Sequence, residues 1–542
     1  MTATITWPTL ANGGKPSTTA FGKAAWKATL VPFGDTTISL AIDDEQNWRK
    51  NYMKHVLDIV NLQANCTDNK TVIASARAGL AAMNSSMLCG PQTASEAIIT
   101  PDTTSTPVSG PFSTKTIFCT TPSSSIASSS SSFTIPHPTN PSKTLENENV
   151  LKQVSLWADY GCIEMGCKKS IGNILTDPHT ASNACKDKIF VLLGATSALG
   201  PFDTLANLGA TIACVSRSGK KLDNLIEKAQ NSTSATLLLP EKSGGAVGGD
   251  LLADAPSLAT WIASLDASKE LVLCCLVYLD GEKHVRASVA MDCIVEYVMK
   301  NRKKGNVSLS YLTSPATAHV RSQESVAMYE QNLADAPFWH SGLRLVAGLA
   351  NNSSKVLDSG LSVMNGLSGV QGPNYALAKT SQQWRAIVAK SEGATVSANH
   401  APPARTESMI SYPTIKAALN GMQVSELMKT KKYIRATTKL TLFSIVFSRS
   451  PQKFKPMVAF RPETASALMA GLLLNDLVSS ASVANKDNKS EIHPMELFVQ
   501  NAAHGGSWGC AYSTDSSGPS AYILGKISGD FTPEGSVIKY QN

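Results

Sequence analysis

Residues 188–222 read KIFVLLGATSALGPFDTLANLGATIACVSRSGKKL, and most of the information on the architecture lies here. Ile189 to Leu193 is a continuous apolar run, typical of a parallel strand that is covered on both faces. Small residues then recur in a turn, where backbone N–H groups can approach a pyrophosphate at a helix N-terminus. The stretch therefore predicts a nucleotide-binding βαβ unit. Its candidate cofactor contacts in the turn are Gly194, Thr196, Ser197, Ala198, Leu199 and Gly200.

The second strand of this unit, Ala210 to Val215, ends in a basic turn that contains Ser216, Arg217, Ser218 and Lys221. A carboxylate at this place would accept hydrogen bonds from the ribose hydroxyls of NAD, whereas Arg and Lys attract a 2'-phosphate. The residue types therefore favour NADP over NAD as the cofactor. The alternative is a solvated basic turn without a ligand.

Composition excludes several functional classes. The net charge is only +7 over 542 residues, and no Lys/Arg block alternates with aromatic residues, so nucleic-acid binding is not inferred. The eleven cysteines lack zinc-ligand spacing, so no metal site is expected. The apolar runs are shorter than the ~20 residues of a membrane helix. We expect a cytoplasmic protein without a membrane span, or an organelle matrix protein if the basic N-terminus is a transit segment.

The chain is long enough for two or three units. Strands and helices alternate after Lys188, which predicts an α/β fold with a doubly wound, Rossmann-like parallel sheet. Helical spacing before it predicts a mostly helical N-terminal extension. The expected divisions are a helical region at 1–99, a flexible Ser/Thr/Pro-rich linker or loop at 100–144, a helical connector at 145–185, the nucleotide-binding domain at 186–510 and a C-terminal tail at 511–542.

A candidate proton donor is Tyr375, which precedes Lys379 by one helical turn. A neighbouring ammonium lowers the pKa of a phenol, so such a pair can act as an acid/base. The same spacing recurs at Tyr412–Lys416 and Tyr522–Lys526, but only Tyr375 lies in a helical stretch between two expected strands. The alternative is an ordinary residue of an amphipathic helix.

These pieces together resemble a short-chain dehydrogenase/reductase, a family that opens with T-G-x-x-x-[AG]-x-G and carries Y-x-x-x-K. The resemblance covers roughly residues 186–510 and marks a divergent member, with an extra N-terminal region and an insertion at 315–372. It implies that Asp250 and Leu251 contact adenine and that Pro402 lies beside the nicotinamide.

The resemblance also implies a catalytic serine. Its position at the end of the fifth strand favours Ser314, whereas spacing from Tyr375 favours Ser362 or, less well, Ser368. The expected activity is NADP-dependent reduction of a carbonyl, or oxidation of an alcohol, on a small-molecule substrate.

Some positions depart from the family pattern. Leu193 replaces a threonine, Pro403 replaces a glycine, and Tyr278 to Gly281 stand where N-N-A-G is usual. Two alternatives therefore stay open: an inactive scaffold or assembly subunit, and a nucleotide-sugar epimerase or dehydratase. A homo-oligomer or larger assembly could form through the N-terminal region. His504 has no evident acid partner, and we interpret it as part of a glycine-rich turn beside Trp508.

Overall fold

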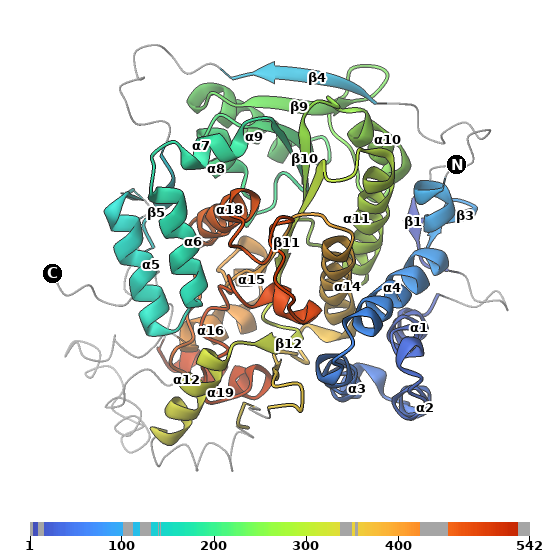
Figure 1. Ribbon diagram of the computed structural model, residues 1–542, viewed down its shortest axis with the longest axis vertical. Helices are drawn as coiled ribbons and strands as arrows, with labels where there is room; N and C mark the ends of the chain where they lie inside the picture. The colour runs from blue at the N-terminus through green and yellow to red at the C-terminus, as the bar shows by residue number, and fades with distance from the viewer. Residues whose placement is uncertain are drawn as a thin grey trace.

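The computed structural model describes residues 4–8, 16–100, 112–119, 132–138, 140, 142–336, 350–352, 356–422 and 454–528. Its centre is a seven-stranded sheet in the order β14-β11-β10-β7-β8-β9-β4 (Figure 1). The strands are β4 (Ser113–Phe118), β7 (Lys188–Leu193), β8 (Thr211–Val215), β9 (Thr236–Glu241), β10 (Glu270–Cys275), β11 (Val307–Thr313) and β14 (Val396–His400). All except β4 are parallel. The fold is therefore α/β with a mostly parallel sheet, as predicted.

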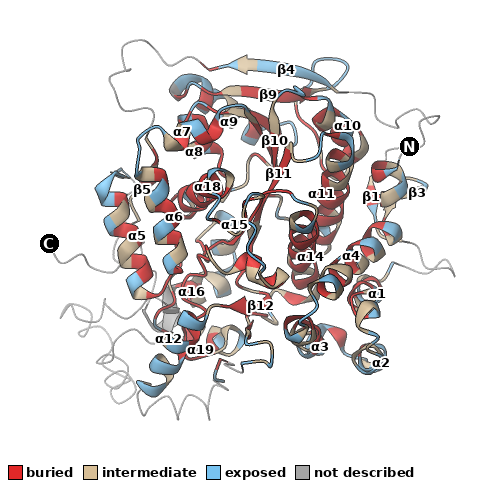
Figure 2. Cartoon of the chain, viewed as in Figure 1, coloured by how far each residue is buried: buried red, intermediate tan, exposed pale blue. Residues whose placement is uncertain are grey.

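Side chains of the central strands alternate between two hydrophobic cores. Val191 and Leu193 enter one core, while Phe190 and Leu192 enter the other. The first core lies under α10 (Ala255–Ser264), α11 (Glu282–Asn301) and α14 (Gly372–Ser391). The second lies under α8 (Phe202–Asn207), α9 (Lys220–Ser232) and α18 (Pro462–Val478). Both faces of the sheet are thus covered, which explains the unbroken apolar runs of its strands (Figure 2).

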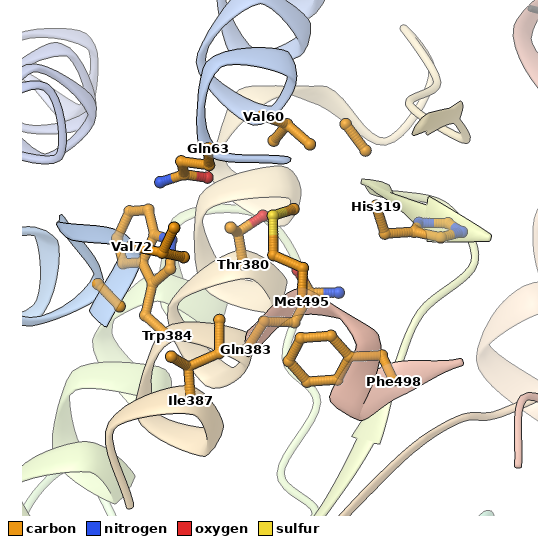
Figure 3. Close-up of a pocket in the computed structure, with 12 residues that line it drawn as sticks. Val60, Gln63, Val72, His319, Thr380, Gln383, Trp384, Ile387, Met495 and Phe498 are labelled. Atoms are coloured by element: carbon orange, nitrogen blue, oxygen red, sulfur yellow. The ribbon is translucent and has the colours of Figure 1, made fainter. Parts of the chain in front are cut away.

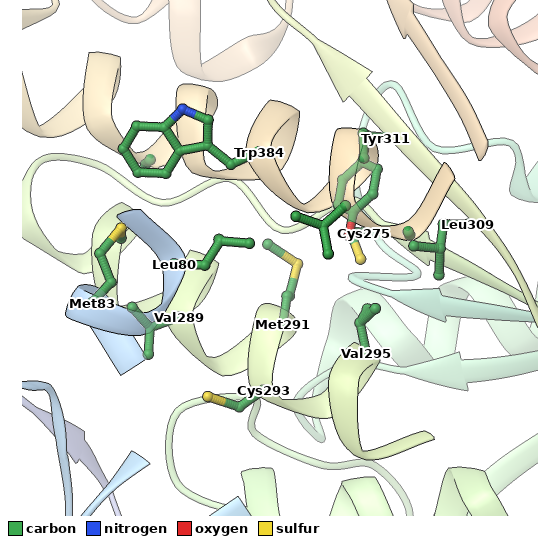
Figure 4. Close-up of a cluster of buried hydrophobic side chains, with 14 of the residues drawn as sticks. Leu80, Met83, Cys275, Val289, Met291, Cys293, Val295, Leu309, Tyr311 and Trp384 are labelled. Carbon is green, nitrogen blue, oxygen red and sulfur yellow. The ribbon is translucent and has the colours of Figure 1, made fainter. Parts of the chain in front are cut away.

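The N-terminal region is helical, as predicted, but it shares the first core instead of forming a separate unit. It contains α1 (Thr18–Ala28), η1 (Val31–Phe33), α2 (Thr37–Asp44), α3 (Trp48–Asn65), α4 (Asn69–Ser86), η2 (Ser95–Ile99) and the short strands β1 (Ile5–Thr6), β2 (Leu88–Cys89) and β3 (Gln92–Thr93). Leu80 and Met83 of α4 pack toward α11, near Trp384 of α14 (Figure 4). These helices therefore add a third layer outside α11 and α14.

A small cavity of about 20 Å³ remains between this layer and α14 (Figure 3). Val60 and Gln63 of α3 line it, opposite Thr380 and Gln383 of α14. The cavity is large enough for a single water molecule, and its lining is mostly apolar.

The prediction of a flexible linker at 100–144 is wrong for part of that segment. Ser113–Phe118 forms β4, which pairs antiparallel with β9 along the edge of the sheet. Two further strands, β5 (Thr134–Pro136) and β6 (Thr144–Glu146), form a hairpin. The physical reason is that Thr and Ile suit strands and that the edge of β9 offers unpaired backbone groups. Residues 101–111 and 120–131 of the segment lie outside the described residues.

The segment 145–185 is helical, as predicted, but it covers the sheet instead of only connecting two units. Its helices α5 (Glu148–Tyr160), α6 (Met165–Leu175) and α7 (Thr180–Cys185) contribute Trp157 and Ile171 to the second core. Both α6 and α7 pack against α18. Apolar faces on these helices require such a partner, which a free connector would not provide.

The expected insertion and tail also contain regular structure. The insertion includes β12 (Ala318–Arg321), α12 (Gln323–Ala334) and β13 (Ser362–Asn365), with β12 and β13 paired antiparallel. The tail includes α19 (Thr514–Ser528), which packs against α16 (Pro413–Met422), the helix after α15 (Glu407–Ile410). A short helical turn, η4 (Pro494–Phe498), lies between α18 and α19 in the chain and packs into the first core. No helix within the described ranges is long and apolar enough to cross a membrane.

If the N-terminal layer shares the core, truncating one of its buried leucines must destabilise the whole protein. Leu80 is 3% exposed, whereas Leu40 on α2 is 62% exposed. We expect Leu80→Ala to lower the free energy of unfolding by about 2–5 kcal/mol and Leu40→Ala by about 0.5 kcal/mol or less. Urea denaturation followed by circular dichroism measures both. Equal effects of the two substitutions would contradict the shared core.

Candidate functional site

The six parallel strands place their carboxyl ends at one edge of the sheet, and the candidate site lies there. Across the sheet they lie in the order β9-β8-β7-β10-β11-β14, which is 3-2-1-4-5-6 when they are numbered along the chain from β7. The crossover after β7 covers one face through α8, and the crossover after β10 covers the other through α11. In such sheets ligands bind in the crevice where the connections diverge, here between β7 and β10.

Tyr375 and Ser314 meet at this edge although 61 positions separate them. The Tyr375 hydroxyl donates a hydrogen bond of 2.8 Å to Ser314 Oγ. Ser314 directly follows β11, and Tyr375 lies in the first turn of α14, which Pro373 helps to begin. Ser314 Oγ also accepts the N–H of Ala316 at 3.1 Å. Both acceptor sites of the oxygen are then used, so its own proton is available to a neighbour.

The other two serine candidates lie in different contacts. Ser362 belongs to β13, where its Oγ accepts from Arg321 Nε at 3.4 Å. The carbonyl of Ser368 accepts from the Tyr52 hydroxyl at 2.9 Å. Of the three serines, Ser314 is the one whose hydroxyl is hydrogen-bonded to Tyr375.

Lys379 follows Tyr375 by one turn of α14, and two hydrogen bonds fix the position of its ammonium group. Its Nζ donates to the carbonyl of Leu312 at 3.1 Å and to Gln382 Oε1 at 3.3 Å. Burial lowers the pKa of Lys379 to about 8. The ammonium therefore loses its proton within a range of pH that is accessible to experiment.

The pKa of Tyr375 is shifted in the opposite direction from the one expected from the sequence. Burial raises the pKa of Tyr375. This effect outweighs that of the hydrogen bonds with Ser314 and Gln371, which lower the pKa. Lys379 is half-buried and directs its hydrogen bonds to Leu312 and Gln382. In the ligand-free protein Tyr375 therefore holds its proton, which suits a proton donor rather than a base.

The glycine-rich turn fits tightly against the loop after β10. Gly194 has φ +103°, and a Cβ on it would lie 2.8 Å from Val277 Cγ2. The N–H groups of Gly194 and Ala195 donate to the carbonyl of Val215, and Gly200 N–H closes a turn on Ser197. The turn is compact, with Ala198 exposed and Thr196 and Leu199 half-buried. The helix that follows, α8, has only six residues.

The basic turn after β8 lies beside the glycine-rich turn. Ser216 Oγ is 3.2 Å from Thr196 Oγ1, so the two turns touch. Arg217 and Ser218 are exposed, and Ser218 also bonds the carbonyl of Val247. Lys221 is exposed and 4.0 Å from the Glu407 carboxylate. Exposed cations at this place fit a bound phosphate and a solvated turn equally well.

Asp250, Leu251 and Pro402 also reach this edge. The backbone N–H of Gly249 donates to the carbonyl of Ser216, which ties the segment of Asp250 to the basic turn. Asp250 Oδ1 accepts the N–H groups of Leu252 and Ala253, so the carboxylate caps its own turn. Leu251 is buried in the first core.

Pro402 is buried on the loop after β14. The N–H of its neighbour Ala401 donates to the carbonyl of Thr313 at 3.0 Å, which fixes the loop to the end of β11. Pro402 therefore follows a residue that is hydrogen-bonded to Thr313, and Thr313 directly precedes Ser314.

Two aromatic residues beside Tyr375 were not predicted from the sequence as site residues. The ring centroids of Tyr278 and Tyr375 are 6.1 Å apart in an edge-to-face arrangement, and the His284 ring is stacked on Tyr375 at 5.8 Å. Among the described residues, His284 Nε2 is buried without a hydrogen-bond partner. Burial, assisted by the charge of Lys379, holds the pKa of His284 well below its ordinary value. The departure from N-N-A-G at Tyr278 was the only sequence signal of this aromatic group.

A buried histidine cluster lies behind Ser314. His319 and His400 have ring centroids 4.3 Å apart, and Trp508 Nε1 donates to His319 Nε2 at 2.7 Å. His400 Nδ1 is 3.1 Å from the hydroxyl of Thr313. The cluster therefore packs directly against the strand end that presents Ser314.

The prediction that His504 lacks an acid partner is wrong. His504 Nε2 is 3.1 Å from Glu164 Oε1, and the ring stacks on Trp508. The two residues are 340 positions apart, so no local pattern could have paired them. Burial raises the pKa of Glu164, but hydrogen bonds from His504 and Ser325 prevail and hold it below the ordinary value.

Within the part of the chain that the structure describes, no group of three or more His, Cys, Asp or Glu side chains could hold a metal ion. Comparisons with family models, with curated proteins and with solved structures found no match. A functional proposal therefore rests on the geometry of the site and on the resemblance of its sequence motifs.

The buried histidines should make the protein sensitive to acid. Burial lowers the pKa of His319 to about 3, whereas an unfolded histidine titrates near 6.5. Between these values the unfolded chain binds a proton that the folded protein does not, so stability falls as pH decreases. The contribution is about 1.4 kcal/mol per pH unit for each such histidine.

We expect His319→Gln to flatten the fall in unfolding free energy between pH 5.5 and 4 by about this amount. The exposed His179, changed to Gln, is the matched control. Denaturant melts at several pH values measure both variants. Parallel curves for His319→Gln and the wild type would contradict the assignment.

Proposed function

We propose that the protein is an NADP-dependent oxidoreductase of the short-chain type, with a Rossmann-like fold, that reduces a carbonyl or oxidises the corresponding alcohol. The observation that carries this proposal is the 2.8 Å hydrogen bond between Tyr375 and Ser314 at the carboxyl edge of the sheet, with Lys379 one turn away. Ser314 comes from a distant part of the sequence, and it meets Tyr375 and Lys379 of α14 where a ligand is expected. Such convergence is typical of an active site.

The residues present fit a dinucleotide. Gly194 allows the turn to pack against Val277, where a Cβ would clash, and the exposed Ala198 leaves the tip of the turn open to an approaching pyrophosphate. Arg217 and Lys221 are exposed on the adjacent turn and would attract a 2'-phosphate. Asp250, Leu251 and Pro402 would line the adenine and nicotinamide sides, as the resemblance implies. When bound, the nicotinamide supplies or accepts the hydride.

The protein's own residues would manage the proton. Tyr375 carries its proton in the ligand-free state and would donate it to the carbonyl oxygen of the substrate. The Ser314 hydroxyl, whose oxygen already accepts two hydrogen bonds, can donate to the same oxygen and orient it. The Lys379 ammonium would stabilise the phenolate that remains. Its anchors at Leu312 and Gln382 fix its position before a substrate binds.

One rival function has an observation in its favour. An inactive scaffold or assembly subunit would explain why α8 has only six residues and why burial raises the pKa of Tyr375.

A nucleotide-sugar epimerase or dehydratase would use the same Tyr and Lys, but the exposed Arg217 favours NADP over the NAD of that class. Retained NAD in the purified protein would favour the epimerase.

The proposal predicts that Tyr375→Phe lowers the rate of NADPH-dependent carbonyl reduction by roughly 10²- to 10⁴-fold, because the proton donor is lost. NADPH should still bind, and more tightly than NADH. Tyr522→Phe is the control, since Tyr522 and Lys526 have the same spacing on α19. Fluorescence titration with NADPH and steady-state assays on a panel of ketones and aldehydes test this. Failure of the wild type to bind NADPH would overturn the proposal.

The pH profile provides an independent test. Because the pKa of Lys379 is about 8, its charge is present below that pH and lost above it. The rate of carbonyl reduction should therefore fall as pH rises past about 8. In Lys379→Arg the guanidinium stays charged, so this limb should move to higher pH. A profile for Lys379→Arg that overlays the wild type would contradict the role of Lys379.

A further inference from the structure

An exposed aromatic residue lies at the mouth of the candidate site. Tyr278 is 43% exposed, three residues after β10, and its ring contacts the Tyr375 ring edge-to-face. Tyr412, between α15 and α16, is 48% exposed and near enough to raise the pKa of Tyr278, although burial is the larger cause. Ile410 of α15 is also exposed. The aromatic surface of Tyr278 thus extends from the Tyr375 ring to solvent.

The orientation of the Tyr278 ring is fixed by its neighbours. The His284 ring lies 4.9 Å from it and is stacked on Tyr375 in turn. The N–H of Leu279 reaches His284 Nδ1 at 3.5 Å, which links the loop of Tyr278 to the first turn of α11. An aromatic surface held in this way loses little entropy when a ligand binds to it.

We propose that Tyr278 is a specificity-determining residue that selects uncharged carbonyl substrates in which the carbonyl is attached to a planar aromatic ring. The inference rests on the proposed function and names its substrate class. The substrate ring would stack on the exposed part of Tyr278 while the carbonyl oxygen reaches the Tyr375 hydroxyl. Stacked and edge-to-face aromatic pairs are favoured over contacts of the same area with a saturated ring.

The charges around the mouth favour a neutral substrate. Asp280 is exposed beside Tyr278 and would repel an anion. Lys379, the cation beside Tyr375, is half-buried and already bonded to Leu312 and Gln382. A bound NADPH would supply the hydride for the carbonyl carbon, and Tyr375 would transfer a proton to the oxygen, which would give NADP⁺ and a secondary or primary alcohol. Bulk water then returns the proton to the phenolate.

The experiment uses a matched pair of ketones, acetophenone and cyclohexyl methyl ketone, which differ in the aromaticity of one six-membered ring. Full-length wild type, Tyr278→Ala and Tyr278→Phe are assayed at saturating NADPH, and kcat/KM is measured for each ketone. The readout is the ratio of the two values, which cancels losses common to both substrates. Tyr278 is exposed, so both variants should fold, and circular dichroism checks this.

We expect the aromatic-to-saturated ratio to fall roughly three- to tenfold in Tyr278→Ala and to stay within about twofold of the wild type in Tyr278→Phe, which keeps the ring. The affinity for NADPH should be unchanged in both. An unchanged ratio in Tyr278→Ala would overturn the inference. If the ratio in Tyr278→Ala is unchanged and NADPH also binds more weakly, the Tyr278 ring stacks on the nicotinamide instead of on the substrate.

Two further outcomes separate this inference from the proposed function. A wild type that binds NADPH and reduces other carbonyls, but neither of these ketones or only the saturated one, would overturn the inference and leave the oxidoreductase proposal intact. A wild type that binds no NADPH and reduces nothing would overturn both.

Discussion

Six parallel strands end at the same edge of the sheet, and the position of every candidate site residue depends on that constraint. A parallel strand needs a crossover before the next one, so the chain returns to this edge only after a long excursion. Ser314 and Tyr375 are brought together in this way, because Ser314 directly follows β11 and Tyr375 lies in the first turn of α14. The hydrogen bond between them is therefore a consequence of sheet topology, and sequence proximity contributes nothing to it.

The precision of the site depends on how α14 is held. Arg385 of this helix is buried and bonds both carboxylate oxygens of Asp292 on α11 at 2.6 and 3.0 Å. Asn84 of α4 donates to the same carboxylate at 2.7 Å. A buried charge pair is stable only when its remaining hydrogen bonds are satisfied, and here the N-terminal layer supplies one of them.

The N-terminal layer also reaches the loop before α14. Tyr52 of α3 bonds the carbonyl of Ser368 in this loop, while Asp515 of α19 accepts the N–H of Gly369. Both ends of the chain therefore help to position the helix that carries Tyr375 and Lys379. This arrangement gives the extra N-terminal region a structural role in the site, whether or not it also binds a partner.

The sequence was informative where a property is local. Apolar runs such as Ile189 to Leu193 predicted buried strands, and the order of elements along the chain favoured Tyr375 with Lys379 over the two other pairs of the same spacing. The predictions failed where long-range contacts decide. Ser113–Phe118 is rich in Ser and Thr and gave no strand signal that outweighed its surroundings, yet it completes the sheet because β9 has an open edge. Glu164 and His504, or Tyr278 and Tyr375, could not be paired without the fold. The direction of the Tyr375 pKa likewise depends on burial, which the spacing of Tyr and Lys does not specify.

The central claim is that Tyr375 protonates a carbonyl while NADPH delivers a hydride beside it. Incubating the full-length protein with a ketone and NADPH that carries deuterium at both C4 positions of the nicotinamide tests this most directly. Mass spectrometry should find one deuterium on the carbinol carbon of the product, formed by the wild type and not by Tyr375→Phe. Unlabelled product, or equal label transfer by both proteins, would contradict the account.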